Sequence, residues 1–179
     1  MRLALASLAL FAFTLPANAA EHDKDLVVHL KAADGKDAGT ATFRETMGNK
    51  LRIKLELKNL PEGDHAVHIH QNPICEAPDF KTAGGHFNPD KKQHGTKNPA
   101  GHHNGDLPEN ITAGMDGTAN KSFTVNYLSL KADSPNSILA NGGTSILVHQ
   151  KADDMMTDPT GNAGNRIACG VITEASVAQ

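Results

Sequence analysis

The 179-residue sequence has no tryptophan and one tyrosine, and aromatic residues make up only 4% of it. So few rings argue against a protein that stacks nucleic-acid bases on aromatic platforms. The chain also lacks an excess of positive charge, because 17 lysines and arginines against 20 acidic residues give a formal net charge of −3 at pH 7. A nucleic-acid-binding protein would carry a basic stripe, so we expect no nucleic-acid partner.

Long hydrophobic runs are missing beyond the first residues. Residues 3–15 are uncharged and mostly apolar, follow Arg2, and precede the small-residue pattern Ala17-Asn18-Ala19. This order is typical of a secretory signal peptide, whereas a membrane span needs roughly 20 apolar residues. We expect residues 1–19 to be a signal peptide, residues 20–179 to form one domain, and no membrane partner. The alternative is a buried N-terminal helix.

Cysteine is limited to Cys75 and Cys169. An even number of cysteines in an exported protein favours a disulfide. The alternative is a pair of buried free thiols.

Several catalytic motifs are absent from the sequence. There is no H-E-x-x-H, G-x-S-x-G, phosphate-binding loop or dinucleotide fingerprint, which argues against the hydrolase and nucleotide-binding classes that depend on them. Histidine, in contrast, is abundant, with ten in all. Seven fall within 39 positions, namely His65, His68, His70, His86, His94, His102 and His103. Outside the ligand candidates below, we expect His22, His29 and His65 to be solvated or structural.

The apolar pattern is that of strands. Leu51, Ile53 and Leu55 alternate with charged residues, which predicts a strand with one wet face. Strands are expected at 26–31, 37–46, 51–58, 65–71, 121–128, 144–150 and 167–173. No segment has convincing helical periodicity. Two long connections, 72–106 and 151–165, are rich in glycine and polar residues, and loops of this length are commonly functional. The fold class is therefore all-β with two long functional loops.

Three histidines on predicted strands can share one side of the sheet. Residues two apart in a strand point to the same face, so His68 and His70 lie together. A solvated surface pair would show the same spacing. His149 is out of phase with the apolar Ile146 and Val148 and can join them. An all-imidazole site without a thiolate suits a copper ion that changes oxidation state.

The first long loop holds a second set of candidate ligands. Three histidines with one carboxylate fit a closed, structural zinc site. The candidates are His86, His94, His103 and Asp106. We choose His103 over the adjacent His102 because of its three-residue spacing to Asp106, and expect His102 to be exposed.

Five stretches of the sequence resemble the copper–zinc superoxide dismutase family. The resemblance covers nearly the whole mature chain, in order and with matching spacing. The stretches are 67–70 (VHIH), 84–89 (GGHFNP), 105–107 (GDL), 147–154 (LVHQKADD) and 161–170 (GNAGNRIACG).

The resemblance implies an eight-stranded Greek-key β-barrel, or sandwich, and one role for each matching residue. The implied copper ligands are His68, His70, His86 and His149. The implied zinc ligands are His86, which bridges the two metals, His94, His103 and Asp106. It also implies a Cys75–Cys169 disulfide, a superoxide-guiding Arg166, and an Asp153 carboxylate that holds one ligand of each metal.

The implied activity is the dismutation of superoxide to oxygen and hydrogen peroxide at copper, with His86 releasing copper and taking a proton on reduction. The extended Cys75 loop and the short segment 155–159 resemble the bacterial periplasmic branch, so we expect a periplasmic protein. Lys81 is a candidate replacement for the steering charges that this short loop lacks. Exported relatives are monomers or dimers, and we favour a homodimer.

Two other classes of protein would also explain part of the sequence. A non-catalytic periplasmic copper- or zinc-binding protein accounts for the histidines, the export signal and the disulfide, but it does not need Arg166. A structural β-sandwich with incidental histidines predicts no bound metal.

Overall fold

The computed structural model describes residues 25–177, and in this range the regular structure consists of antiparallel strands and three short 3₁₀ turns. The strands are β1 (Leu26–Ala32), β2 (Asp37–Thr46), β3 (Lys50–Leu57), β4 (Gly63–His65), β5 (Val67–His70), β6 (Ile111–Ala113), β7 (Ala119–Val125), β8 (Thr144–His149) and β9 (Arg166–Ile172). The 3₁₀ turns are η1 (Lys81–Ala83), η2 (Ala140–Gly142) and η3 (Glu174–Val177). The predicted signal peptide and His22 lie outside the described residues. Within them, no helix is long and apolar enough to span a bilayer.

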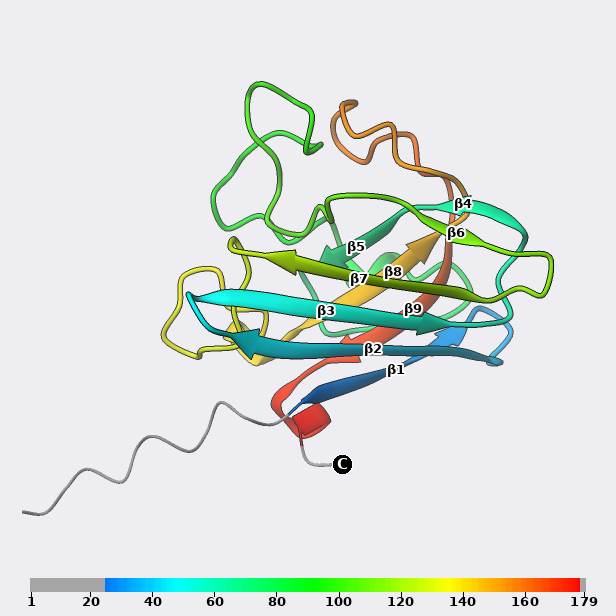
Figure 1. The fold of residues 1–179 in the computed structure, drawn as a ribbon, viewed down its shortest axis with the longest axis horizontal. Helices are drawn as coiled ribbons and strands as arrows, with labels where there is room; N and C mark the ends of the chain where they lie inside the picture. Colours follow the sequence, from blue (N-terminus) through cyan, green and yellow to red (C-terminus); the bar gives the residue numbers. More distant parts are fainter. Residues whose placement is uncertain (1–24, 178–179) are drawn as a thin grey trace, which may run out of the picture.

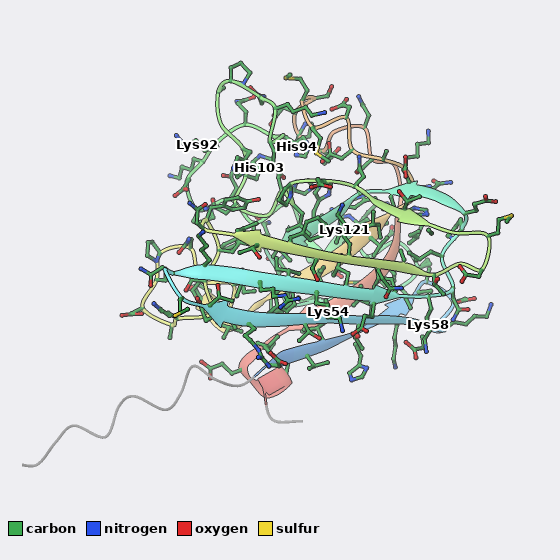
Figure 2. The ribbon with its side chains drawn as sticks, in the orientation of Figure 1. Lys54, Lys58, Lys92, His94, His103 and Lys121 are labelled. Atoms are coloured by element: carbon green, nitrogen blue, oxygen red, sulfur yellow. A yellow bond between two sulfur atoms is a disulfide. The ribbon has the colours of Figure 1, made fainter. Side chains whose placement is uncertain are left out.

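Seven strands form one curled sheet in the order β5-β8-β9-β1-β2-β3-β7. Figure 1 shows β7, β3, β2 and β1 in front of β5, β8 and β9, so the sheet folds over and encloses the core. Phe43, Ile53, Ile69 and Ile146 are all fully buried in that core. On β3 the alternation is as predicted, and Figure 2 shows Lys54 on the outer face of the sheet. The all-β fold class is therefore confirmed.

The prediction of one continuous strand over residues 65–71 is wrong. The chain divides at Ala66 because its two halves pair with different partners: β4 with β6, and β5 with β8. Ala66 itself accepts a hydrogen bond from the His149 amide at 2.9 Å and donates one to the Lys151 carbonyl at 2.8 Å. Counted as one interrupted strand, β4 and β5 bring the nine strands to the predicted eight. The three-residue β6 was not predicted.

The two long loops lie together at one end of the sheet (Figure 1). The Lys97 amide in the first loop donates to the Met155 carbonyl in the second at 3.0 Å. At Gly95, an added Cβ would lie 2.2 Å from the same carbonyl oxygen. Only glycine allows this approach, so the two loops are packed as one layer.

A disulfide links Cys75 in the first loop to Cys169 on β9, with 5.7 Å between the two Cα atoms and a sequence separation of 94. Cys169 packs against Phe80, Ala83 and Leu147. The bond therefore anchors the segment that precedes His86 to the sheet. A disulfide of this kind fits an oxidising compartment.

Removing this disulfide is expected to lower the free energy of unfolding by about 2–5 kcal/mol, because the unfolded chain regains the freedom of a long closed loop. The variant is the double substitution Cys75→Ser and Cys169→Ser, and the measurement is denaturant unfolding of metal-free protein. Reduced wild-type protein is the matched control and should unfold like the variant. A loss below about 0.5 kcal/mol, the size of an ordinary surface substitution, would contradict the expectation.

Candidate metal centre

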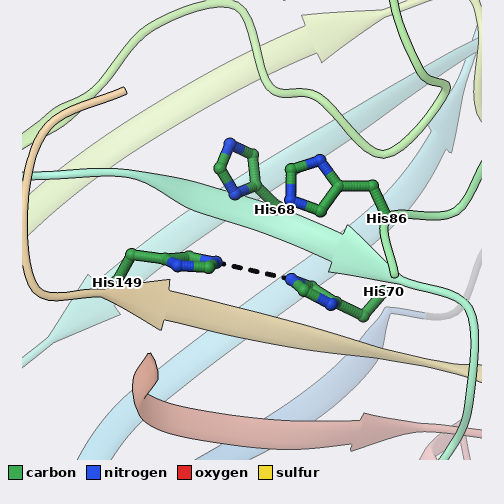
Figure 3. Close-up of side chains that lie close together, drawn as sticks. All are labelled: His68, His70, His86 and His149. Carbon is green, nitrogen blue, oxygen red and sulfur yellow. Dashed lines mark hydrogen bonds between the residues drawn. The ribbon is translucent and has the colours of Figure 1, made fainter. Parts of the chain in front are cut away.

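Four buried imidazoles converge between the sheet and the first loop (Figure 3). His68 and His70 come from β5, His149 from β8, and His86 from the loop. One ring nitrogen from each lies within 4.8 Å of the others, and Nε2 of His70 is 3.4 Å from Nε2 of His149. Nδ1 of His68 and Nε2 of His86 are buried without a hydrogen-bond partner. Such orphaned nitrogens need an explanation, and a metal ion at the centre of the cluster supplies one.

A second cluster surrounds the fully buried Asp106. Its Oδ1 atom lies 2.8 Å from Nδ1 of His86, 3.1 Å from Nδ1 of His94 and 3.4 Å from Nδ1 of His103. Its Oδ2 atom accepts hydrogen bonds from the main-chain amides of Gly95 and His103 at 2.8 and 3.0 Å. Three imidazoles and one carboxylate are a donor set that suits zinc. Figure 2 shows His94 and His103 in the loop layer beyond the sheet.

The His86 ring belongs to both clusters. Its Nδ1 atom faces Asp106, and its Nε2 atom is buried without a hydrogen-bond partner on the side of the first cluster (Figure 3). His68 also lies within 4.8 Å of His86, His94 and Asp106. Together with His103, whose Nδ1 atom lies 3.4 Å from Asp106, the structure brings together all seven residues predicted as metal ligands.

Asp153 connects the two clusters. Its Oδ2 atom is 2.8 Å from Nε2 of His68, and its Oδ1 atom is 3.0 Å from Nε2 of His94. Oδ1 also accepts the Met155 amide at 2.6 Å. A carboxylate bound to the outer nitrogen of a histidine fixes its tautomer and directs the other nitrogen at the metal.

Asn110 holds the main chain of Asp153 in place, a role that is not predicted from the sequence. The Asn110 side chain accepts the Asp153 amide at 2.8 Å and donates to the Asp153 carbonyl at 2.9 Å. The two residues are 43 positions apart. No local sequence pattern signals such a contact.

Main-chain carbonyls hold the remaining two rings of the first cluster. Nδ1 of His70 donates to the Gly84 carbonyl at 3.0 Å, and Nδ1 of His149 lies 3.4 Å from the Gly164 carbonyl. Both contacts leave Nε2 directed at the cluster. The ring orientations are therefore set before any metal binds.

The first cluster favours neutral imidazoles. Burial and the neighbouring His86 and His149 rings hold the pKa of His70 well below its usual value. Burial and the His68 and His86 rings lower the pKa of His149 in the same way. Burial and His68 lower the pKa of His86 to about 3, despite the hydrogen bond with Asp106. Neutral rings have a free lone pair, which metal binding requires.

The second cluster pairs an ionised carboxylate with a protonated imidazole. Burial alone would raise the pKa of Asp106, but hydrogen bonds from His103, His86 and His94 outweigh it and hold that pKa far below its usual range. Burial would likewise lower the pKa of His94, yet its hydrogen bonds to Asp106 and Asp153 raise it to about 9. A zinc ion bound here would replace the extra proton on His94 and balance the negative charge of Asp106.

Comparison with known proteins identifies the family. The sequence model described as "Copper/zinc superoxide dismutase (SODC)" matches residues 37–172. The chain belongs to the copper/zinc superoxide dismutase family. Superoxide dismutase [Cu-Zn] 1 of Aquifex aeolicus is 45% identical, covering 77% of this chain and 81% of its own. Superoxide dismutase [Cu-Zn] of Caulobacter vibrioides is 46% identical, covering 80% and 82%.

A solved structure of a superoxide-dismutase-like protein from Bacillus subtilis has the same fold. The TM-score is 0.78 at 39% sequence identity, covering 82% of this chain and 97% of that one. The recognition of a copper–zinc superoxide dismutase of bacterial type from the sequence is thus confirmed.

In this superoxide dismutase family member, a surface cavity of about 650 Å³ leads to the first cluster. His149 and Arg166 both line it. The Arg166 guanidinium donates to the Phe80 carbonyl at 2.6 Å and to the Gly84 carbonyl at 2.5 Å. A guanidinium has five N–H donors and stays charged, so it can hold its place on the loop and still attract an anion.

Lys81 also lines this cavity, but the neighbouring Asp79 largely offsets its positive charge. Its Nζ atom lies 2.8 Å from Asp79, and its side chain is 83% exposed. An exposed pair of this kind has little net charge. The proposal that Lys81 steers an anion stays a prediction.

The prediction that His102 is exposed is wrong, because the ring is half-buried against Tyr127, with 4.5 Å between ring centroids. The Tyr127 hydroxyl donates to the Asp106 carbonyl at 3.0 Å, so this aromatic contact supports the second cluster from outside. His29 is exposed, and His65 is buried between the His149 and Pro61 carbonyls, 2.8 Å from each. These two histidines are solvated and structural, respectively, as predicted.

Proposed function

We propose that this chain is an enzyme that converts two superoxide anions and two protons into oxygen and hydrogen peroxide. The proposed copper ligands are His68, His70, His86 and His149, and the proposed zinc ligands are His86, His94, His103 and Asp106. The observation that carries the proposal is the His86 ring, whose two nitrogens face two different donor sets. A store for one metal needs no shared ring.

His103 is preferred to His68 as the fourth zinc ligand. The Nε2 atom of His68 is already bonded to Asp153, and its orphaned Nδ1 belongs to the group formed with His70, His86 and His149. His103 instead directs Nδ1 at Asp106. Each proposed site then has four ligands, with His86 common to both.

The chain's own residues provide the acid–base part of the reaction. Bound copper would supply one-electron oxidation and reduction. Bound zinc would keep the same oxidation state and would hold the His86 ring in place. His86 keeps its orientation through Nδ1, so its Nε2 atom can take up a proton when it is not a ligand and give it to the reduced product. The neighbouring carbonyls and Asp153 keep the other three rings still during this exchange.

Arg166 is proposed to attract superoxide into the cavity. Arg166→Ala is expected to lower the second-order rate constant for the reaction with superoxide about 10-fold or more. The reason is that two opposite unit charges about 4 Å apart attract each other by roughly 1–4 kcal/mol near a protein surface. The remaining rate should also depend less on ionic strength. Stopped-flow rates over a range of salt concentrations measure both effects.

Two variants serve as controls for Arg166. Arg166→Lys keeps the charge and should retain part of the salt dependence. Lys81→Ala changes the same cavity and should have a smaller effect, because Asp79 offsets that charge. A salt dependence that is unchanged in Arg166→Ala would contradict the steering role.

Export and assembly complete the proposal. We propose a signal peptide over residues 1–19, a mature domain over residues 20–179 that resides in the periplasm, and a homodimer, with neither nucleic acid nor membrane as partner. The disulfide and the bacterial relatives support the location. Size-exclusion chromatography with light scattering tests the dimer, and N-terminal sequencing of exported protein tests the cleavage.

The activity is tested by measuring superoxide loss catalysed by purified mature protein loaded with both metals, with copper and zinc counted on the same sample. We expect one of each metal per chain and rapid dismutation that requires copper. Two bound metals without activity would contradict the proposal and favour a metal-storage protein. A failure to bind metal would favour a structural module.

A further inference from the structure

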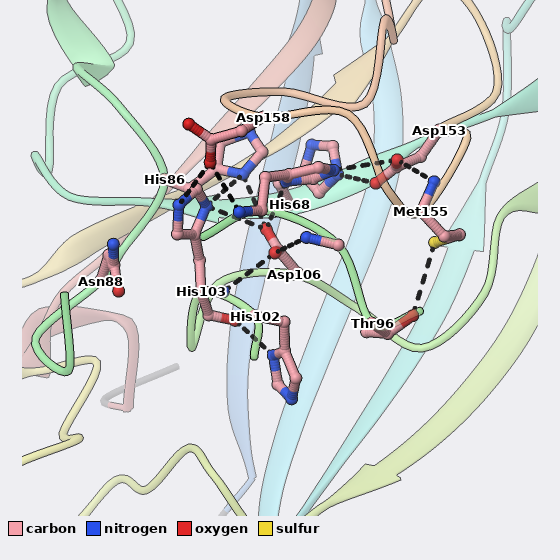
Figure 4. A network of polar contacts seen from close by, with 12 residues as sticks. His68, His86, Asn88, Thr96, His102, His103, Asp106, Asp153, Met155 and Asp158 are labelled. Atoms are coloured by element: carbon pink, nitrogen blue, oxygen red, sulfur yellow. Dashed lines mark hydrogen bonds and ion pairs between the residues drawn. The ribbon is translucent and has the colours of Figure 1, made fainter. Parts of the chain in front are cut away.

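The second long loop brings another carboxylate to the second cluster, which contains the proposed zinc ligands and is called the zinc-side cluster below. Oδ1 of Asp158 accepts the main-chain amide of His94 at 2.7 Å and lies 3.8 Å from Nε2 of His103 (Figure 4). The His103 side chain is only 9% exposed, whereas Asp158 is 44% exposed. Asp158 therefore covers the outer edge of a nearly buried imidazole.

The outer nitrogens of the other two zinc-side histidines are already accounted for. Nε2 of His94 is bonded to Asp153, and Nε2 of His86 faces the copper-side cluster. For His103, whose Nδ1 faces Asp106, the outer nitrogen is Nε2. Among residues 25–177, Asp158 is the one acidic residue within 4.0 Å of that atom.

We propose that Asp158 is a positioning residue for the zinc site, which holds the Nε2–H of His103 so that the lone pair of Nδ1 points at the metal. The inference rests on the proposed zinc site and goes beyond its ligand set. Carboxylates that bind the outer nitrogen of a ligating histidine typically change metal affinity 10- to 100-fold. The 3.8 Å separation is longer than a hydrogen bond, so we expect an effect near 10-fold, at the lower end of that range.

The position of Asp158 does not depend on the His103 contact. Its hydrogen bond from the His94 amide fixes the Asp158 side chain. The preceding turn is closed separately by Asp154, whose Oδ1 atom accepts the amides of Met156 and Thr157 at 2.9 and 2.8 Å. In the part of the chain that the structure describes, no side-chain hydrogen bond of Asp154 reaches a histidine of either cluster. The chain thus offers a matched control in the same loop, one that disturbs the turn without removing the carboxylate.

The two carboxylates of this loop that contact cluster histidines, Asp153 and Asp158, should differ in the metals whose binding they affect. Asp153 contacts one histidine from each cluster, so its loss affects both metals. Among residues 25–177, the polar contacts of the Asp158 side chain are with His94 and His103 alone, so its loss should weaken zinc binding and leave copper binding unchanged.

The test is the zinc affinity of copper-free protein, measured by competition with a chelator of known affinity, for wild type, Asp158→Ala, Asp158→Asn and Asp154→Ala. We expect Asp158→Ala to weaken zinc about 10-fold. Asp158→Asn should recover most of that loss, because an amide oxygen can still accept the His94 amide and face Nε2 of His103. Copper affinity should be the same in wild type and both Asp158 variants, and Asp154→Ala should bind zinc like wild type.

Nuclear magnetic resonance of zinc-loaded protein gives a second readout. Wild type should show a slowly exchanging His103 Nε2–H, which Asp158→Ala should lose and Asp154→Ala should keep. Wild-type zinc affinity in Asp158→Ala, or an equal loss in Asp154→Ala, would overturn the inference while leaving the proposed function intact. Wild-type protein that binds no zinc would overturn both.

Discussion

Replacing His86 with alanine is expected to abolish dismutase activity and to weaken the binding of both metals. In the two proposed sites the ring supplies Nδ1 beside Asp106 and Nε2 beside the other imidazoles, so one substitution removes one of four proposed donors from each site. Each metal affinity should fall by at least about 100-fold, because losing a direct ligand exceeds the 10- to 100-fold effect of losing an outer partner.

His149→Ala is the matched comparison. His149 belongs only to the imidazole cluster and makes no contact with Asp106, so its loss should weaken copper and spare zinc. Metal affinities by chelator competition and superoxide loss by stopped flow measure the two variants side by side. If His86→Ala kept wild-type affinity for either metal, the ring would not be shared.

Replacing Asp153 with asparagine is expected to lower the affinity for copper about 10- to 100-fold and to lower the affinity for zinc less. The Oδ1 atom accepts both His94 and the Met155 amide, whereas Oδ2 accepts only His68. The amide oxygen of asparagine should therefore take the Oδ1 place and turn its NH₂ group toward His68. His68 must then move its proton to Nδ1, the nitrogen that the proposed copper site needs.

Gly161→Ala tests the same carboxylate without changing it. An added Cβ would lie 1.7 Å from Oδ1 of Asp153 and 2.6 Å from Nε2 of His94. Both side chains must shift, and His94 belongs to the zinc-side group. The affinity for zinc should therefore fall more than the affinity for copper, whereas Asp153→Asn should lower the affinity for copper more. Equal effects of the two variants on both metals would show that they act through general loop disorder rather than through these contacts.

The sequence predicted most of the sheet because alternation along a strand is a local pattern. The strand predicted at residues 37–46 is β2 with the same bounds, and the out-of-phase position of His149 placed its ring beside His70. The division at Ala66 was missed because it depends on pairing with β6 and β8, which are distant in the chain. Strand pairing is not encoded in the period of a single segment.

The candidate ligands could be selected from the sequence because histidine clustering and the family motifs both lie in it, and the structure places them close together. The outer contacts could not, since they depend on how the two loops pack. His102 was expected to be exposed, yet the loop places its ring on Tyr127. Asn110 and Asp158 reach the centre across 43 and 64 positions respectively, distances over which no motif is visible.

The most direct test of the shared ring is anomalous X-ray diffraction from crystals of protein loaded with copper and zinc, with data collected at the absorption edge of each metal. We expect two separate peaks on opposite sides of the His86 imidazole, copper beside Nε2 and zinc beside Nδ1. A single peak, or two peaks of which one has no contact with His86, would contradict this expectation.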